Sequence, residues 1–305
     1  MLANKQEILG GELLKRSMQA VVASGRVTHA YIISGRTGFG KKMFAHLFAK
    51  AILCVLPNDG TACGTCKSCT TFDTGNNPDL TIFAPKKENY EIKEMREEVL
   101  PNMSIKPHFS ERRVYIITKA DTMNPQTQNA FLKSLEDGPK HIVFILLANS
   151  TQSFLATIMS RVIEYKIPPL NQETIYEELI KKGINKEVAR TATWLADGGM
   201  GRALKIAEND DYLQMQNEII NLAKNIEKMT IADIFKKANE LETYKKNSQD
   251  MIDIFKLYYR DKLVAGETSA IKKIHAIDDI NDKLKRSCPY LLCMEIMLLN
   301  LAGKC

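Results

Sequence analysis

Four cysteines fall within a stretch of sixteen residues and give the sequence its most specific chemical signal. They follow the spacing C-x8-C-x2-C-x2-C at Cys54, Cys63, Cys66 and Cys69. Thiolates gathered by one loop suit tetrahedral Zn²⁺, and a site with four sulfur ligands leaves no position for a reacting water. A cytosolic chain keeps its thiols reduced, which disfavours a disulfide framework. We therefore expect a structural zinc module over about residues 53–76, against the alternative of four ordinary thiols on a loop.

A glycine-rich segment before this cluster has the pattern of a phosphate-binding loop. Gly35, Gly38, Gly40 and Lys41 form a G-x4-G-K motif that follows the apolar segment Ala30–Ser34 and precedes a helical pattern. In this setting the loop amides form an anion nest, and the lysine reaches the β- and γ-phosphates of a nucleotide. A chance glycine turn is the alternative.

Nucleotide hydrolysis at such a loop normally needs two further groups of residues, and both are missing from this sequence. Lys42 stands where a Ser or Thr would hold Mg²⁺, and an ammonium group repels a cation. The second half should be an apolar strand that ends in Asp-Glu, but residues 114–117 are followed by Thr118 and Lys119. Asp121 lies three residues beyond the expected Asp, and we expect it to cap the turn that follows. The loop could still bind ATP or ADP, but we expect no Mg²⁺-dependent hydrolysis.

Strand-like and helix-like segments alternate over the first 165 residues and predict a parallel sheet that is covered on both faces. Strands are expected at Ala30–Ser34, Leu80–Phe83, Arg113–Ile117 and Ile142–Leu147. Helices are expected over residues 44–52, 92–100 and 124–135, and after residue 170 the periodicity is helical throughout, beginning with 172–182 and 186–196. We predict an α/β domain at residues 1–166, a small helical domain at 167–208 and a larger helical domain at 209–305.

The composition is typical of a folded soluble protein, with 45% apolar and 26% charged residues among 305. It excludes a disordered chain, a collagen-like repeat and a coiled-coil rod. Because there is no apolar run of ~18–20 residues and no signal-peptide core, we expect a cytoplasmic protein without a membrane segment. The net charge of +6 comes from residues 1–208, which carry 27 basic and 21 acidic side chains. That excess permits contact with phosphates without requiring it.

Two further polar features follow the last predicted strand of the α/β region. Asn149 and its neighbours could sense a γ-phosphate, although a capped turn explains them equally well. Arg161 follows Ser160 at the end of a short helical pattern. By itself, an arginine in this place is typical of a solvated charge at a helix end.

Seven segments of the chain together carry a family resemblance. They are His29–Tyr31, the loop 35–41, the cysteine cluster, Asn77–Asp79, Arg113–Ile117, Asn129–Glu136 and Ser160–Arg161. On these segments the chain resembles the AAA+ subunits of the bacterial DNA polymerase III clamp loader, strongly over residues 1–208 and more weakly beyond. The resemblance implies a P-loop AAA+ domain with a zinc-binding insertion, then a helical lid and an all-α collar that joins subunits.

The resemblance also implies a role in DNA replication. Such a subunit would join gamma/tau motor subunits and a delta subunit in a hetero-pentamer that loads the β sliding clamp on primed DNA, with sequence-independent backbone contacts. Lys42, Thr118 and Lys119 look like the non-hydrolysing delta-prime kind, in which Arg161 would be an arginine finger supplied to a neighbour's ATP site. Two positions depart from the family pattern: Val162 replaces the usual cysteine after Ser-Arg, and Gly201 replaces a sensor arginine.

Three alternatives remain open at this point. An ATP-hydrolysing gamma/tau-type motor is favoured by Lys41 and opposed by the missing acidic residues. A stand-alone zinc-containing P-loop NTPase or kinase meets the same objection. A single-strand DNA-binding module ranks last, because aromatic residues make up only 7% of the chain and do not interleave with basic ones.

Overall fold

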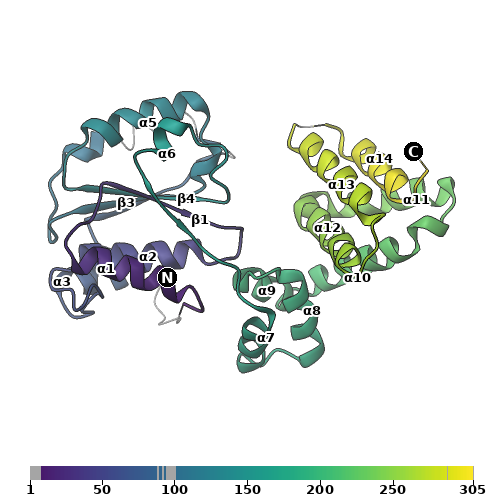
Figure 1. Ribbon diagram of the computed structural model, residues 1–305, viewed down its shortest axis with the longest axis horizontal. Coiled ribbons are helices and arrows are strands. Elements are labelled where there is room, and N and C mark those ends of the chain that lie inside the picture. Colours follow the sequence, from purple (N-terminus) through teal and green to yellow (C-terminus); the bar gives the residue numbers. More distant parts are fainter. Residues whose placement is uncertain (1–7, 88, 91–92, 94–100, 287, 305) are drawn as a thin grey trace. The chain divides into compact units, whose positions relative to one another are not determined.

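The computed structural model describes residues 8–87, 89–90, 93, 101–286 and 288–304 (Figure 1). The chain separates into two compact units. The first comprises Met1–Ile175 with Gly198–Arg202, and the second comprises Tyr176–Asp197 with Ala203–Cys305. The three-part division predicted from the sequence stays a prediction.

A five-stranded parallel sheet forms the centre of the first unit, in the order β2-β3-β4-β1-β5. The strands are β1 (Ala30–Ser34), β2 (Leu80–Phe83), β3 (Arg113–Ile117), β4 (Ile142–Ala148) and β5 (Ile163–Lys166). Every residue of β1, β3 and β4 is buried, which is why these strands read as continuous apolar runs in the sequence. The edge strand β5 was not predicted, because only Tyr165 of its four residues is buried.

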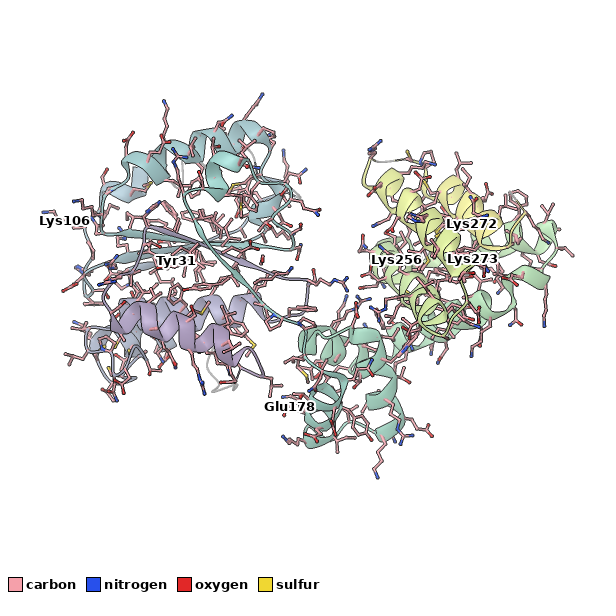
Figure 2. All side chains as sticks on the ribbon, viewed as in Figure 1. Tyr31, Lys106, Glu178, Lys256, Lys272 and Lys273 are labelled. Carbon is pink, nitrogen blue, oxygen red and sulfur yellow. The ribbon has the colours of Figure 1, made fainter. Side chains whose placement is uncertain are left out.

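Helices cover both faces of this sheet (Figure 1). Helices α1 (Glu12–Ala23) and α2 (Lys41–Leu53) pack on one face, where the rings of Tyr31 and Phe48 meet edge-on at 4.8 Å. Figure 2 shows Tyr31 within this layered core. Helices α5 (Pro125–Asp137) and α6 (Ala156–Met159) cover the other face, where Phe131 meets Phe144 at 4.8 Å. The predicted parallel α/β architecture is confirmed.

Short elements complete the first unit. They are α3 (Lys67–Asp73) and the 3-10 turns η2 (Pro101–Ser104) and η3 (Ala120–Thr122). The helix predicted over residues 92–100 lies outside the described residues, apart from Lys93.

The elements described after β5 are all helical. They are α7 (Gln172–Lys181), α8 (Lys186–Ala196), α9 (Met200–Ala207), α10 (Asp210–Asn225), η4 (Ile226–Lys228), α11 (Ile231–Glu240), η5 (Leu241–Asn247), α12 (Ser248–Val264), α13 (Ala270–Lys285) and α14 (Tyr290–Leu301). In the second unit, Arg260 of α12 pairs with Asp197 at 2.5 Å, and the Trp194 indole donates to Asp261. These contacts join α8 to α12. None of the described helices combines the length and apolar character that a membrane-spanning segment needs.

Candidate functional site

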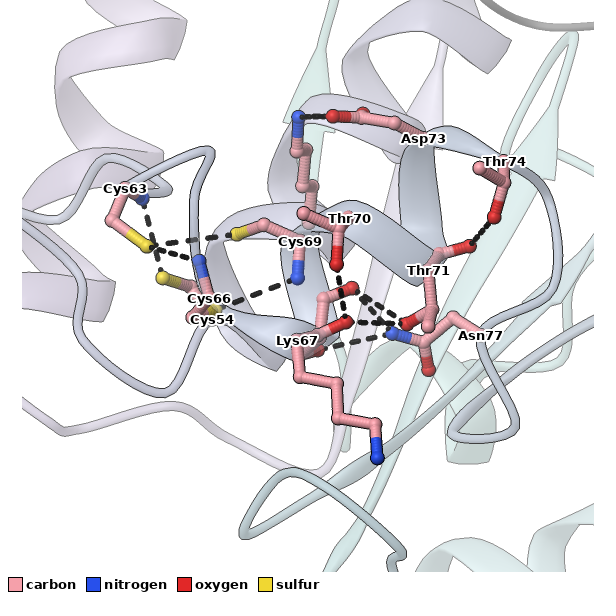
Figure 3. A network of polar contacts seen from close by, with 12 residues as sticks. Cys54, Cys63, Cys66, Lys67, Cys69, Thr70, Thr71, Asp73, Thr74 and Asn77 are labelled. Atoms are coloured by element: carbon pink, nitrogen blue, oxygen red, sulfur yellow. Dashed lines mark hydrogen bonds and ion pairs between the residues drawn. The ribbon is translucent and has the colours of Figure 1, made fainter.

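The four cysteines converge at the carboxyl end of α2 (Figure 3). Cys54 follows the last residue of that helix, Cys66 caps the first turn of α3, and Cys69 lies within α3. Their four sulfur atoms all lie within 4.8 Å of one another, and Cys63 Sγ is 4.0 Å from Cys69 Sγ. Tetrahedral Zn²⁺ with bonds of ~2.3 Å would hold its sulfur ligands about 3.8 Å apart. The donor set and its spacing therefore fit a metal ion such as zinc.

Backbone amides stabilise negative charge on these sulfurs. The amide of Cys63 donates to Cys54 Sγ at 3.2 Å, that of Cys66 to Cys63 Sγ at 3.4 Å, and that of Cys69 to Cys66 Sγ at 3.5 Å. The amides of Cys66 and Thr65 lower the pKa of Cys63 to about 6. Burial instead raises the pKa of Cys54 and Cys69. A bound cation would offset that burial cost by holding all four as thiolates.

The module is fixed to α1 by a tight turn. Asn58 and Thr61 form an antiparallel bridge around Gly60, which has a positive φ of 74°. A Cβ atom at Gly60 would lie 1.9 Å from the carbonyl oxygen of Gln19 in α1. Only glycine lets the turn approach that helix so closely.

A polar network connects the cysteine module to the rest of the sheet. Ser110 Oγ donates to the carbonyl of Leu53 at 2.6 Å and lies 3.1 Å from Ser68 Oγ in α3. Asn77 donates to the carbonyl of Ser68 at 2.8 Å (Figure 3). The buried carboxylate of Asp79 accepts from three consecutive amides at residues 108–110, at 2.6, 2.8 and 3.0 Å. The segment 77–79, which carried part of the family resemblance, is therefore a structural brace of the module.

The phosphate loop lies at the other end of α2, and its lysine faces its own backbone. Lys41 Nζ donates to the carbonyls of Gly35 at 2.5 Å and Arg36 at 3.0 Å, and to Asn149 Oδ1 at 2.8 Å. Burial lowers the pKa of Lys41 to about 8, while the nearby charge of Asp121 acts in the opposite direction. The ammonium group thus has three acceptors within the protein.

The tip of the loop contacts the start of α9. The amide of Gly201 donates to the carbonyl of Gly38 at 2.9 Å. Gly38 has a positive φ of 86°, and a Cβ atom there would lie 2.8 Å from the amide nitrogen of Arg202. Gly201, which the sequence places where the family has a sensor arginine, therefore contacts the loop through its backbone.

Asp121 has a different role from the predicted one. Its Oδ2 accepts from the amide of Asn149 at 3.0 Å, and its carbonyl accepts from Ser153 Oγ at 3.0 Å. It caps the turn after β4, not the turn that follows it in the chain. That prediction was wrong because the partner comes from the neighbouring strand, which sequence distance does not reveal. Asn149 also accepts from Thr37 Oγ1 at 3.2 Å and so joins the loop to β4.

The positions where acidic residues were expected do not contribute to this cluster. Thr118 Oγ1 donates to the carbonyl of Phe83 at 3.1 Å. Lys119 has a left-handed backbone at φ 50° and precedes η3. Lys42 is exposed on the first turn of α2. Asp121 is the acidic residue that follows these two positions in the sequence, and its Oδ2 accepts a hydrogen bond from the amide of Asn149.

Arg161 lies just past α6, and its guanidinium group contacts the end of that helix and the end of α5. Nη1 donates to the carbonyl of Thr157 at 3.0 Å and to Ser160 Oγ at 3.2 Å. Nη2 lies 2.7 Å from Glu136 Oε1 at the end of α5. Sequence reasoning did not assign Glu136 a role, although it belongs to a segment that carried the resemblance.

A buried glutamine supports the segment before Arg161. Gln128 donates to the carbonyls of Met123 at 3.0 Å and Ser153 at 2.9 Å, and it accepts from the amide of Leu155 at 2.8 Å. All of its hydrogen-bonding contacts are to backbone, so it fixes the loop from β4 to α6 against α5. No local sequence signal distinguishes this glutamine from an exposed one.

Comparisons with known proteins agree with the arrangement. The family described as "DNA polymerase III, delta subunit" matches residues 11–171. The chain is 29% identical to the DNA polymerase III delta-prime subunit of Bacillus subtilis over 259 residues, which cover 83% of this chain and 78% of the relative. It is 30% identical to the gamma subunit of Buchnera aphidicola from Schizaphis graminum, over 74% of this chain and 63% of the relative. The chain thus spans less than two thirds of that second relative.

A solved structure shares the fold. A DNA polymerase III gamma subunit-related protein from Thermotoga maritima has a TM-score of 0.53 at 15% identity, over 95% of this chain and 99% of that one. At this identity the likeness shows the fold alone. Together with the parallel sheet, the four-cysteine insertion and the helical carboxyl-terminal part, it confirms the predicted fold class.

Proposed function

Because the chain belongs to the DNA polymerase III delta-subunit family, which matches more than half of it, we propose that it acts as a clamp-loader subunit of the delta-prime kind. In this role it assembles with gamma/tau-type motor subunits and a delta subunit into a hetero-pentamer. The complex loads the β sliding clamp on primer–template DNA during replication. The basic excess of residues 1–208 supports sequence-independent contacts with the DNA backbone.

The observation that carries the delta-prime assignment is the state of the phosphate loop. Lys41 donates to two loop carbonyls and Asn149, and neither Thr118 nor Lys119 supplies a carboxylate for Mg²⁺. A nucleotide bound at this loop would therefore lack the usual protein ligands for its metal ion. This arrangement supports a subunit that does not hydrolyse ATP, even where the loop binds ATP or ADP.

We propose that the cysteine cluster holds one structural Zn²⁺ ion through Cys54, Cys63, Cys66 and Cys69. All four positions of a tetrahedral ion would be filled by protein sulfur, so the ion would stabilise the module without reacting. The lid at residues 167–208 and the collar at 209–305 are proposed from the family resemblance.

We further propose that Arg161 completes the ATP site of a neighbouring motor subunit. An arginine finger stabilises the charge that develops on the transferred phosphoryl group and can raise the rate by ~10³–10⁵. Its position just past a short helix, with a side chain 37% exposed, leaves the guanidinium accessible from outside the chain.

The test is ATP hydrolysis by clamp loaders that are rebuilt with wild-type, Arg161→Ala or Arg161→Lys subunit. We expect intact assembly and a partial loss of DNA- and clamp-stimulated ATPase, because only one of several ATP sites receives this finger. Lysine should not restore the rate, since it lacks the planar fork. Arg190→Ala, which removes an exposed arginine of α8, is the matched control. Equal rates and equal clamp loading for all variants would show that Arg161 is an ordinary helix-end charge.

An ATP-hydrolysing gamma/tau-type motor is the second candidate. The 30% identity to a gamma subunit and the intact G-x4-G-K motif favour it. It requires a source of metal-binding carboxylates other than Thr118 and Lys119.

A further inference from the structure

The guanidinium group of Arg161 has three acceptors within this chain. Nη1 has two acceptors, the Thr157 carbonyl at 3.0 Å and Ser160 Oγ at 3.2 Å, and Nη2 contacts Glu136 at 2.7 Å. Of these acceptors only Glu136 carries a charge. A guanidinium binds a phosphate through its N–H groups, and Nη2 of Arg161 now faces the Glu136 carboxylate.

Carboxylate and phosphate are interchangeable partners for an arginine fork. Both present oxygen pairs that accept two parallel N–H groups, and both neutralise its charge. The Arg161 and Glu136 side chains are 37% and 41% exposed, so their ion pair is in contact with solvent and can exchange readily. Exposed pairs of this kind shift an equilibrium by up to about fivefold.

We infer that Glu136 is a positioning residue that holds Arg161 in a resting place and competes with the neighbour's ATP for it. This inference rests on the proposed function of Arg161 as a finger. Each time Arg161 contacts the neighbour's ATP, its guanidinium group exchanges the Glu136 carboxylate for a phosphate. Because Glu136 competes for Arg161, the neighbouring subunit binds ATP more weakly than it would if Arg161 were free. ATP binding in the neighbour is therefore coupled to the release of Arg161 from Glu136.

Glu136→Gln is the sharpest variant for this inference. It keeps the length and shape of the side chain and removes the charge from an exposed position at the end of α5. A negative charge at a helix carboxyl end is unfavourable, so its loss should not weaken the fold. Asp137→Asn is the matched control, because it removes the same charge from the next residue, which is also exposed.

The measurement is the ATP dependence of hydrolysis by the rebuilt clamp loader, with KM and kcat determined separately. We expect Glu136→Gln to lower KM for ATP by up to about fivefold at the one site that receives the finger, with kcat unchanged, because bound ATP no longer competes with the carboxylate. The KM of the whole complex should fall by less, since its other ATP sites are unaffected. Asp137→Asn should match wild type. The difference between Glu136→Gln and wild type should shrink at high salt, which screens the ion pair. A purely structural role for Glu136 would not move KM in this direction.

The Arg161→Ala background separates this inference from the function on which it rests. There, adding Glu136→Gln should change nothing, because the group that Glu136 holds is absent. If Arg161→Ala slows the complex but Glu136→Gln leaves KM unchanged or raises it, the resting contact has no regulatory role and the inference fails alone. If Arg161→Ala has no effect, the finger assignment itself fails.

Discussion

Helix α2 has a candidate site at each end, and the two sites differ in how their residues are brought together. The cysteine module at its carboxyl end takes all four sulfur donors from residues 54–69, and they converge in the fold. The phosphate loop at its amino end needs partners from β3 and β4, and there the carboxylates are replaced by Thr118 and Lys119. The donors of the cysteine module come from one short segment, whereas those of a phosphate-loop site come from several. A site distributed over several strands can lose its chemistry while its loop persists.

Among the variants that test this comparison, loss of one sulfur ligand should have the largest effect on metal content and stability. Cys69 is buried in α3, and Cys69→Ser should abolish stoichiometric zinc and destabilise the first unit by several kcal/mol, because metal binding and folding of such a module are coupled. Elemental analysis and urea unfolding measure the two effects. Cys288→Ser, which removes an exposed thiol outside the cluster, is the control. Wild-type protein with far less than one metal per chain would refute the zinc site.

A substitution of Asp79, which braces the cysteine module, should have the next largest effect on stability. Asp79→Asn replaces a carboxylate that accepts from three amides with a group that turns an N–H₂ toward them, which should cost about 1–3 kcal/mol. Asp73→Asn removes a carboxylate that pairs with Lys50 in a partly exposed ion pair and should cost less than about 1 kcal/mol. Equal losses in urea unfolding would show that the buried carboxylate does not brace the module.

Disturbing the contact between the phosphate loop and the start of α9 should have a smaller effect on stability. Gly38→Ala and Gly40→Ala carry nearly the same backbone penalty, since φ is 86° and 87°. Only at Gly38 does the new methyl group approach another residue, the amide of Arg202 at 2.8 Å, whereas nothing lies within 4 Å at Gly40. We expect Gly38→Ala to cost about 1 kcal/mol more. Hydrogen exchange at residues 198–202 should rise only in Gly38→Ala, and similar exchange in both variants would contradict the contact.

A further effect is a pH dependence that comes from Lys41. Its pKa is about 8 in the folded chain and 10.5 in the ordinary state, so between these values the unfolded chain binds more protons. The free energy of unfolding of wild type relative to Lys41→Met should therefore rise with pH from about 8 to 10.5. Lys42→Met, which removes an exposed ammonium group one residue away, is the reference. A wild-type advantage that falls over this window would show that Lys41 is not desolvated.

The parts that sequence could predict are those that depend on neighbouring residues. The cysteine spacing predicted the cluster, continuous apolar runs predicted β1, β3 and β4, and the mostly apolar segment Leu80–Phe83 predicted β2. The strand β5 was missed because an exposed edge strand of four residues leaves little apolar pattern. The partners of Asp121, Gln128 and Glu136 could not be predicted, since each lies on a different segment that only the fold brings close.

The most direct test of the account is ATP hydrolysis by the isolated chain in the presence of Mg²⁺. The account predicts a rate no faster than buffer, with or without DNA, because Lys42, Thr118 and Lys119 replace the hydroxyl and the two carboxylates that Mg²⁺-dependent hydrolysis needs. Lys41→Ala should then be indistinguishable from wild type. Robust turnover that Lys41→Ala abolishes would contradict the silent phosphate loop and identify the chain as a motor subunit.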